Sequence, residues 1–172
     1  MFLKAFKVKS NEKYLNKLLS QRKVNVDDAK IKSLGILLDF DEIDNFNVFN
    51  PLASQLKLHS NTIKAIGYTG NVKSQGNSWD VCFNETDFGW KGIVKNVELQ
   101  TFINTPFDML LSFYDKPVQE LKLITAKSIS KFKVGILQTD ERLNDLIIKT
   151  SVKEVDVFCN ELVKYLNVLH KI

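Results

Sequence analysis

Four acidic residues lie at the end of the first strongly apolar run of the chain or just after it. The run spans residues 33–40 (SLGILLDF), and the acids are Asp39, Asp41, Glu42 and Asp44. Such a run is typical of a strand in a parallel sheet that is covered on both faces. Ligands of open α/β sheets bind at the carboxyl ends of these strands, and carboxylate oxygens suit Mg²⁺. Asp39, Asp41 and Asp44 are therefore candidate metal ligands for phosphoryl transfer.

The D-x-D spacing after an apolar strand is similar to the first motif of haloacid dehalogenase-type phosphatases. That resemblance implies Asp39 as the nucleophile and Asp41 as the general acid/base, with Thr69 where the family has a hydroxyl residue. The sequence departs from the family at Ile43, where Thr or Val is usual, and no later strand ends in an acidic pair. An acidic loop that only caps a helix fits the same residues, and we expect this second interpretation.

No other catalytic or nucleotide-binding motif occurs in the sequence. The patterns G-x-G-x-x-G, G-x-x-x-x-G-K-[ST] and G-x-S-x-G are all absent. Cys82 and Cys159 match neither a metal-binding pair nor a disulfide framework, which favours a reducing compartment. No apolar run approaches the ~18 residues of a membrane helix, and the start of the chain does not resemble a secretory signal. We expect a cytoplasmic protein without a cofactor.

Positive charge is concentrated at the beginning of the chain. Residues 1–33 carry nine Lys and Arg against three acids, a net charge of +6, whereas residues 34–172 carry −2. This partition predicts a basic helical arm at residues 1–30 attached to an α/β domain at residues 31–172, and it indicates a polyanionic partner. The candidate binding residues are the basic side chains of the arm: Lys4, Lys7, Lys9, Lys13, Lys17, Arg22 and Lys23.

An amphipathic helix is expected over residues 2–22. Lys9, Lys13 and Lys17 recur at i, i+4 spacing on one face. The helix can dock on its own domain, grip RNA or a partner, or lie on a membrane surface, although its low hydrophobicity disfavours the membrane. The other face is expected to be apolar and to hold Phe2, Leu3, Phe6, Tyr14, Leu15, Leu18 and Leu19.

Residues 107–137 have the order of a β-α-β unit, with apolar strands at residues 107–113 and 132–137. Asp115 can cap the helix between them, and Pro117 suits its first turn. The apolar stripe of this helix is expected to contain Val118, Leu121, Leu123, Ile124 and Ile129. Off the stripe lies a second set of lysines, either a solvated face, which we favour, or a phosphate-binding patch: Lys116, Lys127, Lys131 and Lys133.

Aromatic side chains gather near a segment rich in Gly, Asn and Ser at residues 70–78, which predicts a loop. These aromatics are Trp79, Phe83, Phe88 and Trp90. They can stack nucleobases or anchor a partner. Packing in the core is the interpretation we favour.

The remaining pattern alternates strands with helices. Further strands are expected at residues 62–69, 79–83 and 143–148, and helices at 45–59, 97–103 and 152–169. The fold class is therefore α/β, a doubly wound, mostly parallel sheet of about five strands, Rossmann-like or flavodoxin-like. We expect residues 33–40, 62–69, 107–113 and 132–137 to be parallel neighbours, with these side chains buried against them: Leu121, Ile124, Phe158 and Leu162.

Several segments of the chain, AKIKSLGILLD, KAIGY, INTPFDMLLSF and SKFKVG, resemble an uncharacterised bacterial family of single-domain α/β proteins. That resemblance implies an architecture and no chemistry. The segment PFDMLLSFYD…AKSISKFKVGI also looks like a β-α-β unit of heptosyltransferase-type glycosyltransferases, over about thirty residues that serve mostly in packing.

The charge partition and the incomplete enzyme motifs favour a binding function. We expect a non-catalytic protein that docks on RNA, on a ribonucleoprotein such as the ribosome, or on an acidic protein. The alternative is a Mg²⁺-dependent phosphohydrolase, or another small-ligand enzyme, that uses Asp39 and Asp41. The sequence leaves the oligomeric state open.

Overall fold

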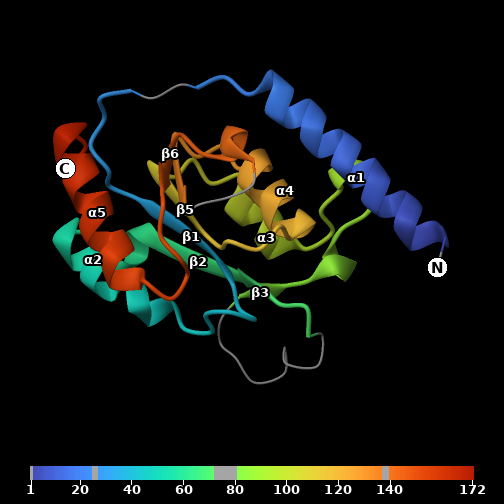
Figure 1. Cartoon of the computed structure of the whole chain (residues 1–172), viewed down its shortest axis with the longest axis horizontal. Coiled ribbons are helices and arrows are strands. Elements are labelled where there is room, and N and C mark those ends of the chain that lie inside the picture. The colour runs from blue at the N-terminus through green and yellow to red at the C-terminus, as the bar shows by residue number, and fades with distance from the viewer. Residues whose placement is uncertain (1, 25–26, 72–80, 137–139) are drawn as a thin grey trace.

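The computed structural model describes residues 2–24, 27–71, 81–136 and 140–172. In these residues, six strands form one sheet in which every pairing is parallel (Figure 1). Its order, β3-β2-β1-β4-β5-β6, is that of Rossmann-type sheets. The strands are β1 (Leu34–Asp39), β2 (Ile63–Tyr68), β3 (Cys82–Phe83), β4 (Met109–Phe113), β5 (Phe132–Ile136) and β6 (Leu146–Ile148).

Five α-helices accompany the sheet: α1 (Phe2–Gln21), α2 (Asn50–Gln55), α3 (Val97–Ile103), α4 (Gln119–Lys127) and α5 (Val155–Val168). Short 3-10 helices lie between them: η1 (Phe46–Phe49), η2 (Ser60–Thr62), η4 (Glu85–Asp87), η5 (Trp90–Gly92) and η6 (Glu141–Leu143). The α/β class and the parallel central strands are confirmed, and each of the six expected strand ranges contains an observed strand. Part of the strand expected at residues 79–83, and most of the loop at 70–78, lie outside the described residues.

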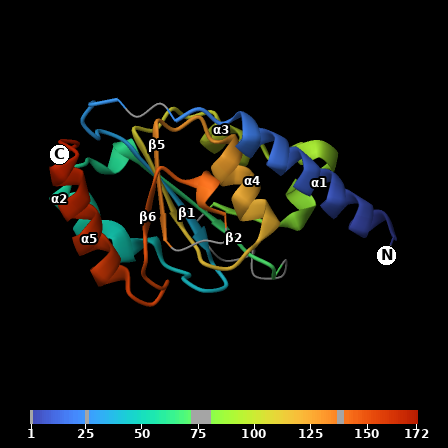
Figure 2. The same ribbon diagram turned by 45° about the horizontal axis from the view of Figure 1, so that its top comes forward.

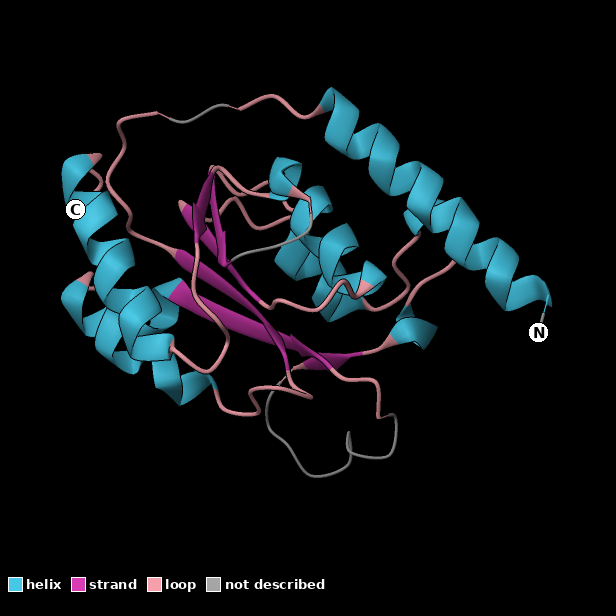
Figure 3. Ribbon diagram, in the orientation of Figure 1, coloured by secondary structure: helices cyan, strands magenta, loops and turns pink. Residues whose placement is uncertain are grey.

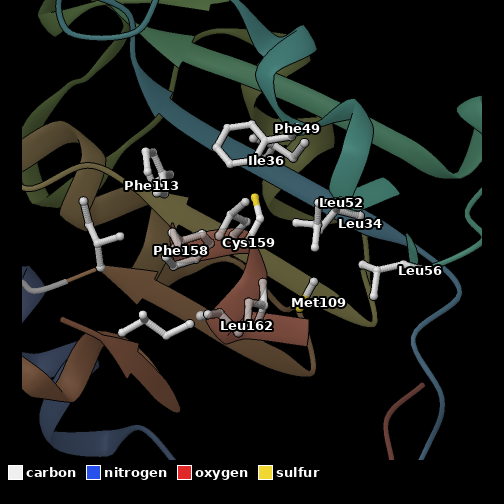
Figure 4. Close-up of a cluster of buried hydrophobic side chains, with 14 of the residues drawn as sticks. Leu34, Ile36, Phe49, Leu52, Leu56, Met109, Phe113, Phe158, Cys159 and Leu162 are labelled. Carbon is white, nitrogen blue, oxygen red and sulfur yellow. The ribbon is translucent and has the colours of Figure 1, made fainter. Parts of the chain in front are cut away.

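The helices form layers on both faces of the sheet, as expected of a doubly wound fold. Helices α2 and α5 cover one face and α3 and α4 the other, while α1 lies outside the α3/α4 layer (Figures 2 and 3). The buried side chains divide accordingly into two clusters. One lies under α2 and α5 and includes Ile36, Phe113 and Phe158 (Figure 4). The other lies under α3 and α4 and includes Leu37 and Leu110.

This division follows from the two-residue period of the strands. Successive residues such as Ile36 and Leu37 point to opposite faces, and both are buried because helices cover both faces. Leu121 and Ile124 of α4 and Phe158 of α5 are completely buried, as is Leu162, which confirms the predicted core. The Phe113 and Phe158 rings meet edge to face, with 4.9 Å between centroids.

Several element ends differ from the sequence-based expectation. Helix α4 begins at Gln119 with Val118 as its N-cap, so Asp115 does not cap it and Pro117 precedes its first turn. Ile129 lies beyond the end of α4 and is 54% exposed, so its place on the buried stripe was wrong. At the C-terminal end, the apolar spacing continues to Ile129 although the helix has ended at Lys127; at the other end, Asp115 and Pro117 lie in the segment between β4 and α4.

Candidate functional site

Helix α1 is docked on the body of the protein, and its buried apolar side chains lie in its second half. Leu15 and Leu19 are buried among the α3/α4 side chains. The side chain of Asn11 is also buried, and its Oδ1 accepts a hydrogen bond of 2.9 Å from the backbone N–H of Gly92. Gly92 has a φ of +67°, and a Cβ there would overlap the ring of Tyr14. The packing of α1 on its own domain, which the sequence left open, is therefore a feature of the fold.

The apolar face expected for α1 is only partly correct. Phe2, Leu3 and Phe6 are 82%, 75% and 58% exposed, so they do not share the buried face of Leu15 and Leu19. An α-helix turns by about 100° per residue, which places Phe2 and Phe6 roughly opposite that buried face. The exposed Phe2 and Phe6 and the buried Leu15 and Leu19 therefore lie on two different faces of α1 and do not form one apolar stripe.

The outward face of α1 carries aromatic and basic side chains together. Lys9, Lys13 and Lys17 are exposed, and within the described ranges none of them makes an ion pair or a side-chain hydrogen bond. Phe2 and Phe6 project from the same face, since residues 2, 6, 9, 13 and 17 differ by three or four positions. We call Phe2, Phe6, Lys9, Lys13 and Lys17 the outer stripe; at 1.5 Å per residue it is about 22 Å long. Simple helical-wheel arithmetic could have found the two phenylalanines.

Three of the other predicted binding residues of the arm contact the body. Lys4 forms an exposed ion pair with Glu85 at 2.8 Å. Lys7 donates to the carbonyl oxygens of Glu85 and Phe88, each at 3.3 Å. Arg22 pairs with the buried carboxylate of Asp145. These three contacts position α1.

Lys23 lies just beyond the end of α1 and is exposed. Within the part of the chain that the structure describes, its ammonium group has no hydrogen bond or ion pair. Lys23 therefore remains available to a ligand.

The structure does not bring all four lysines of the second set together, although Lys131 and Lys133 line the same pocket. Lys116 follows β4 at the carboxyl edge of the sheet, whereas Lys131 precedes β5 at the amino edge and pairs with Asp108 at 2.8 Å. Lys127 lies over the Tyr14 ring, 5.1 Å from its centroid. Lys133 is buried, and its ammonium group donates at 2.7 Å to the carbonyl oxygen of Thr125 in α4.

The acidic loop follows β1, the strand at which the strand order reverses, and contacts residues that follow both of its neighbours, β2 and β4. Lys116 pairs with Glu42 at 3.0 Å. Asp41 is held by β2, because its two oxygens accept hydrogen bonds from Thr69 Oγ1 at 3.0 Å and from the Gly70 N–H at 2.8 Å. Asp44 is exposed. In the described ranges, no three His, Cys, Asp or Glu side chains are placed to hold a metal ion.

Asp39 is almost completely buried, and its Oδ1 accepts a hydrogen bond of 3.1 Å from the Asp41 N–H. Burial raises the pKa of Asp39 above its ordinary value, and the negative charges of Asp41 and Glu42 raise it further. The hydrogen bond and the positive charge of Lys116 oppose this increase. Through this hydrogen bond, the Asp39 side chain caps the turn that follows β1.

Replacing Asp39 by Asn is expected to stabilise the protein at neutral pH. The amide oxygen can keep the bond to Asp41 while the desolvated charge is removed. Since the folded-state pKa of Asp39 is raised, its contribution to stability is present below the unfolded-state value and is lost as the pH rises. The gain in melting temperature of the variant should therefore be larger at about pH 7 than at about pH 4.

The same variant tests the phosphohydrolase alternative. We expect the wild type to show no Mg²⁺-dependent hydrolysis of a phosphomonoester. Hydrolysis by the wild type that disappears in Asp39→Asn would show instead that the acidic loop is catalytic.

The aromatic side chains near the third strand have separate environments. Phe83 and Phe88 are buried and pack on one another with ring centroids 5.9 Å apart. Trp90 is 45% exposed and lines a surface hollow beside Leu3 of α1. Trp79 lies outside the described residues. Core packing therefore accounts for two of these aromatics, and Trp90 remains available to a ligand.

Comparisons with known proteins place the chain in a family. Among the described helices, none has the length and apolar character required to cross a membrane. No curated protein and no solved structure matches the chain significantly. A family described as "Family of unknown function (DUF6913)" matches residues 7–169, which is most of the sequence. The chain therefore belongs to the DUF6913 family, as the resemblance to an uncharacterised α/β family predicted.

Proposed function

We propose that this protein is a non-catalytic, cytoplasmic binding protein that docks on RNA, alone or within a ribonucleoprotein, through the outer stripe of α1. The observation that carries the proposal is the exposure of Lys9, Lys13 and Lys17 on a helix whose opposite side is fixed to the body. Such a helix presents its charges in a set geometry, so less conformational entropy is lost on binding.

The composition of the outer stripe favours nucleic acid over other polyanions. Lysines neutralise phosphates and release counterions. Aromatic rings add stacking with bases, worth about 1–3 kcal/mol per base. Phe2 and Phe6 lie at one end of the stripe, and the lysines extend along the rest. A membrane-surface helix would need a continuous apolar face, but the apolar residues Leu15 and Leu19 are buried against the body.

The triple variant Lys9→Gln, Lys13→Gln, Lys17→Gln tests the proposal. Its affinity for a labelled single-stranded RNA, measured by fluorescence anisotropy, should fall more than tenfold at about 50 mM salt. The slope of log affinity against log salt should decrease in magnitude by about 2, since each lost phosphate contact removes about 0.7. Gln keeps the helix propensity nearly constant, so circular dichroism should be unchanged.

Two further variants make this test specific. The matched control replaces three exposed lysines outside α1, Lys64, Lys149 and Lys153, by Gln; it changes net charge equally and should bind like the wild type. Phe2→Ala with Phe6→Ala should weaken binding and leave the salt slope unchanged. Equal losses in the control and the triple variant, or tighter binding to anionic lipid vesicles than to RNA, would contradict the proposal.

A further inference from the structure

A pocket of about 280 Å³ opens at the amino edge of the sheet, where the end of α1 meets the segment between α4 and β5. It is separate from the outer stripe and from the acidic loop. The polar side chains around it are mainly cationic or hydroxylic: Arg22, Lys23, Ser128, Ser130, Lys131 and Lys133. We call it the α1-end pocket.

Positive charge exceeds negative charge in the α1-end pocket. Asp145 is its one acidic lining residue among those described, and this carboxylate is already bound to Arg22 and to the Lys133 N–H, the latter at 2.7 Å. Lys131 also has a partner, in Asp108. The exposed ammonium group of Lys23 remains for a ligand. The surplus positive charge therefore favours an anion.

Two buried hydroxyl groups also line the pocket. Ser128 Oγ and Ser130 Oγ lie 2.7 Å apart, so one hydroxyl hydrogen joins them. Ser128 Oγ also accepts a hydrogen bond of 3.2 Å from the Ser130 N–H. The second hydroxyl hydrogen has no acceptor within the described ranges. This hydrogen belongs to a hydroxyl group that lines the pocket, so an oxygen of a bound anion can accept it.

The buried ammonium group of Lys133 points to the same kind of ligand. Burial and the positive charge of Arg22 together lower its pKa to about 8, and the negative charge of Asp145 partly opposes them. A bound anion would oppose both effects by favouring the charged form of this lysine.

We propose that the α1-end pocket binds a phosphoryl group, either inorganic phosphate or a small phosphate monoester. Phosphate offers several strong acceptor oxygens for Lys23 and for the free hydroxyl hydrogen of the Ser128–Ser130 pair. The volume is many times the roughly 30 Å³ of a water molecule and lies near the lower limit for small-ligand sites, which suits a small molecule. This inference does not depend on RNA binding by the outer stripe.

Isothermal titration calorimetry with inorganic phosphate and with ribose 5-phosphate, at constant ionic strength, tests the proposal. We expect saturable binding by the wild type and at least a tenfold weaker affinity in Lys23→Gln and in Ser128→Ala with Ser130→Ala. Tighter binding of ribose 5-phosphate would identify an esterified ligand, and equal or weaker binding would identify phosphate itself.

The triple variant of the outer stripe is the control, and it should bind phosphate like the wild type. Failure of RNA binding and failure of phosphate binding are therefore distinguishable. Lys23 is exposed near the end of α1, so Lys23→Gln remains decisive even if the double serine variant does not fold. Absence of saturable binding to both ligands, or equal affinity in Lys23→Gln and the wild type, would overturn the proposal.

Discussion

Replacing Gly92 by Val is expected to detach α1 from the body and to lower the free energy of unfolding by about 3 kcal/mol. A residue with a side chain costs about 1–2 kcal/mol at a left-handed φ such as the +67° of Gly92. Overlap of the new side chain with the Tyr14 ring adds about 1–3 kcal/mol. Urea unfolding measures the loss, and faster proteolysis within residues 2–21 should report the detachment.

This change also tests the importance of docking for function. Most of the stability of a helix in a protein comes from its tertiary packing, so detached α1 should lose the regular spacing of the outer stripe. RNA affinity should therefore fall although every lysine remains. Adding Tyr14→Ala should relieve the overlap and restore part of the stability, while the cost of the left-handed φ remains. Wild-type proteolysis and RNA binding in Gly92→Val would show that α1 docking does not depend on this contact.

Raising the pH from about 8 to about 10.5 is expected to stabilise the wild type by about 3 kcal/mol relative to Lys133→Met. The ordinary pKa of a lysine is 10.5, and burial lowers that of Lys133 to about 8. Between these values the unfolded chain binds a proton that the folded protein does not. The stability contributed by the lowered pKa is complete above 10.5 and is lost as the pH falls through 8. Urea unfolding of both proteins across this range measures the difference.

The comparison separates this titration from other effects of the substitution. Lys133→Met also removes a donor from the Thr125 carbonyl oxygen, but that loss is the same at every pH. Lys131→Met is the control, because the hydrogen bond that Lys131 donates to Asp108 raises the pKa of Lys131, and its contribution stays constant below 10.5. Parallel stability curves for the wild type and Lys133→Met would show that Lys133 is not desolvated.

The sequence by itself determined the layered part of the fold. Residues 34–39 and 109–113 are nearly all apolar, which is the pattern of strands that helices cover on both faces. Helix α3 was predicted with its observed ends at Val97 and Ile103, and the inward positions of α5 were recognised at Phe158 and Leu162. These features depend on local periodicity and burial, which a single sequence contains.

Only the tertiary structure decided the surroundings of the polar and charged groups. From the sequence, Lys133 would be expected on the surface like most lysines. In the fold, β5 places it beneath the end of α4, where its ammonium group donates a hydrogen bond to the Thr125 carbonyl oxygen. In the sequence, Asp41 was a candidate metal ligand, but in the fold its carboxylate accepts a hydrogen bond from Thr69, which follows β2. Likewise, Ser128 and Ser130 carry no motif and join cationic groups from α1 and β5 in the α1-end pocket only after folding. Periodicity shows which side of an element is buried, whereas the partners of a polar side chain come from segments distant in sequence.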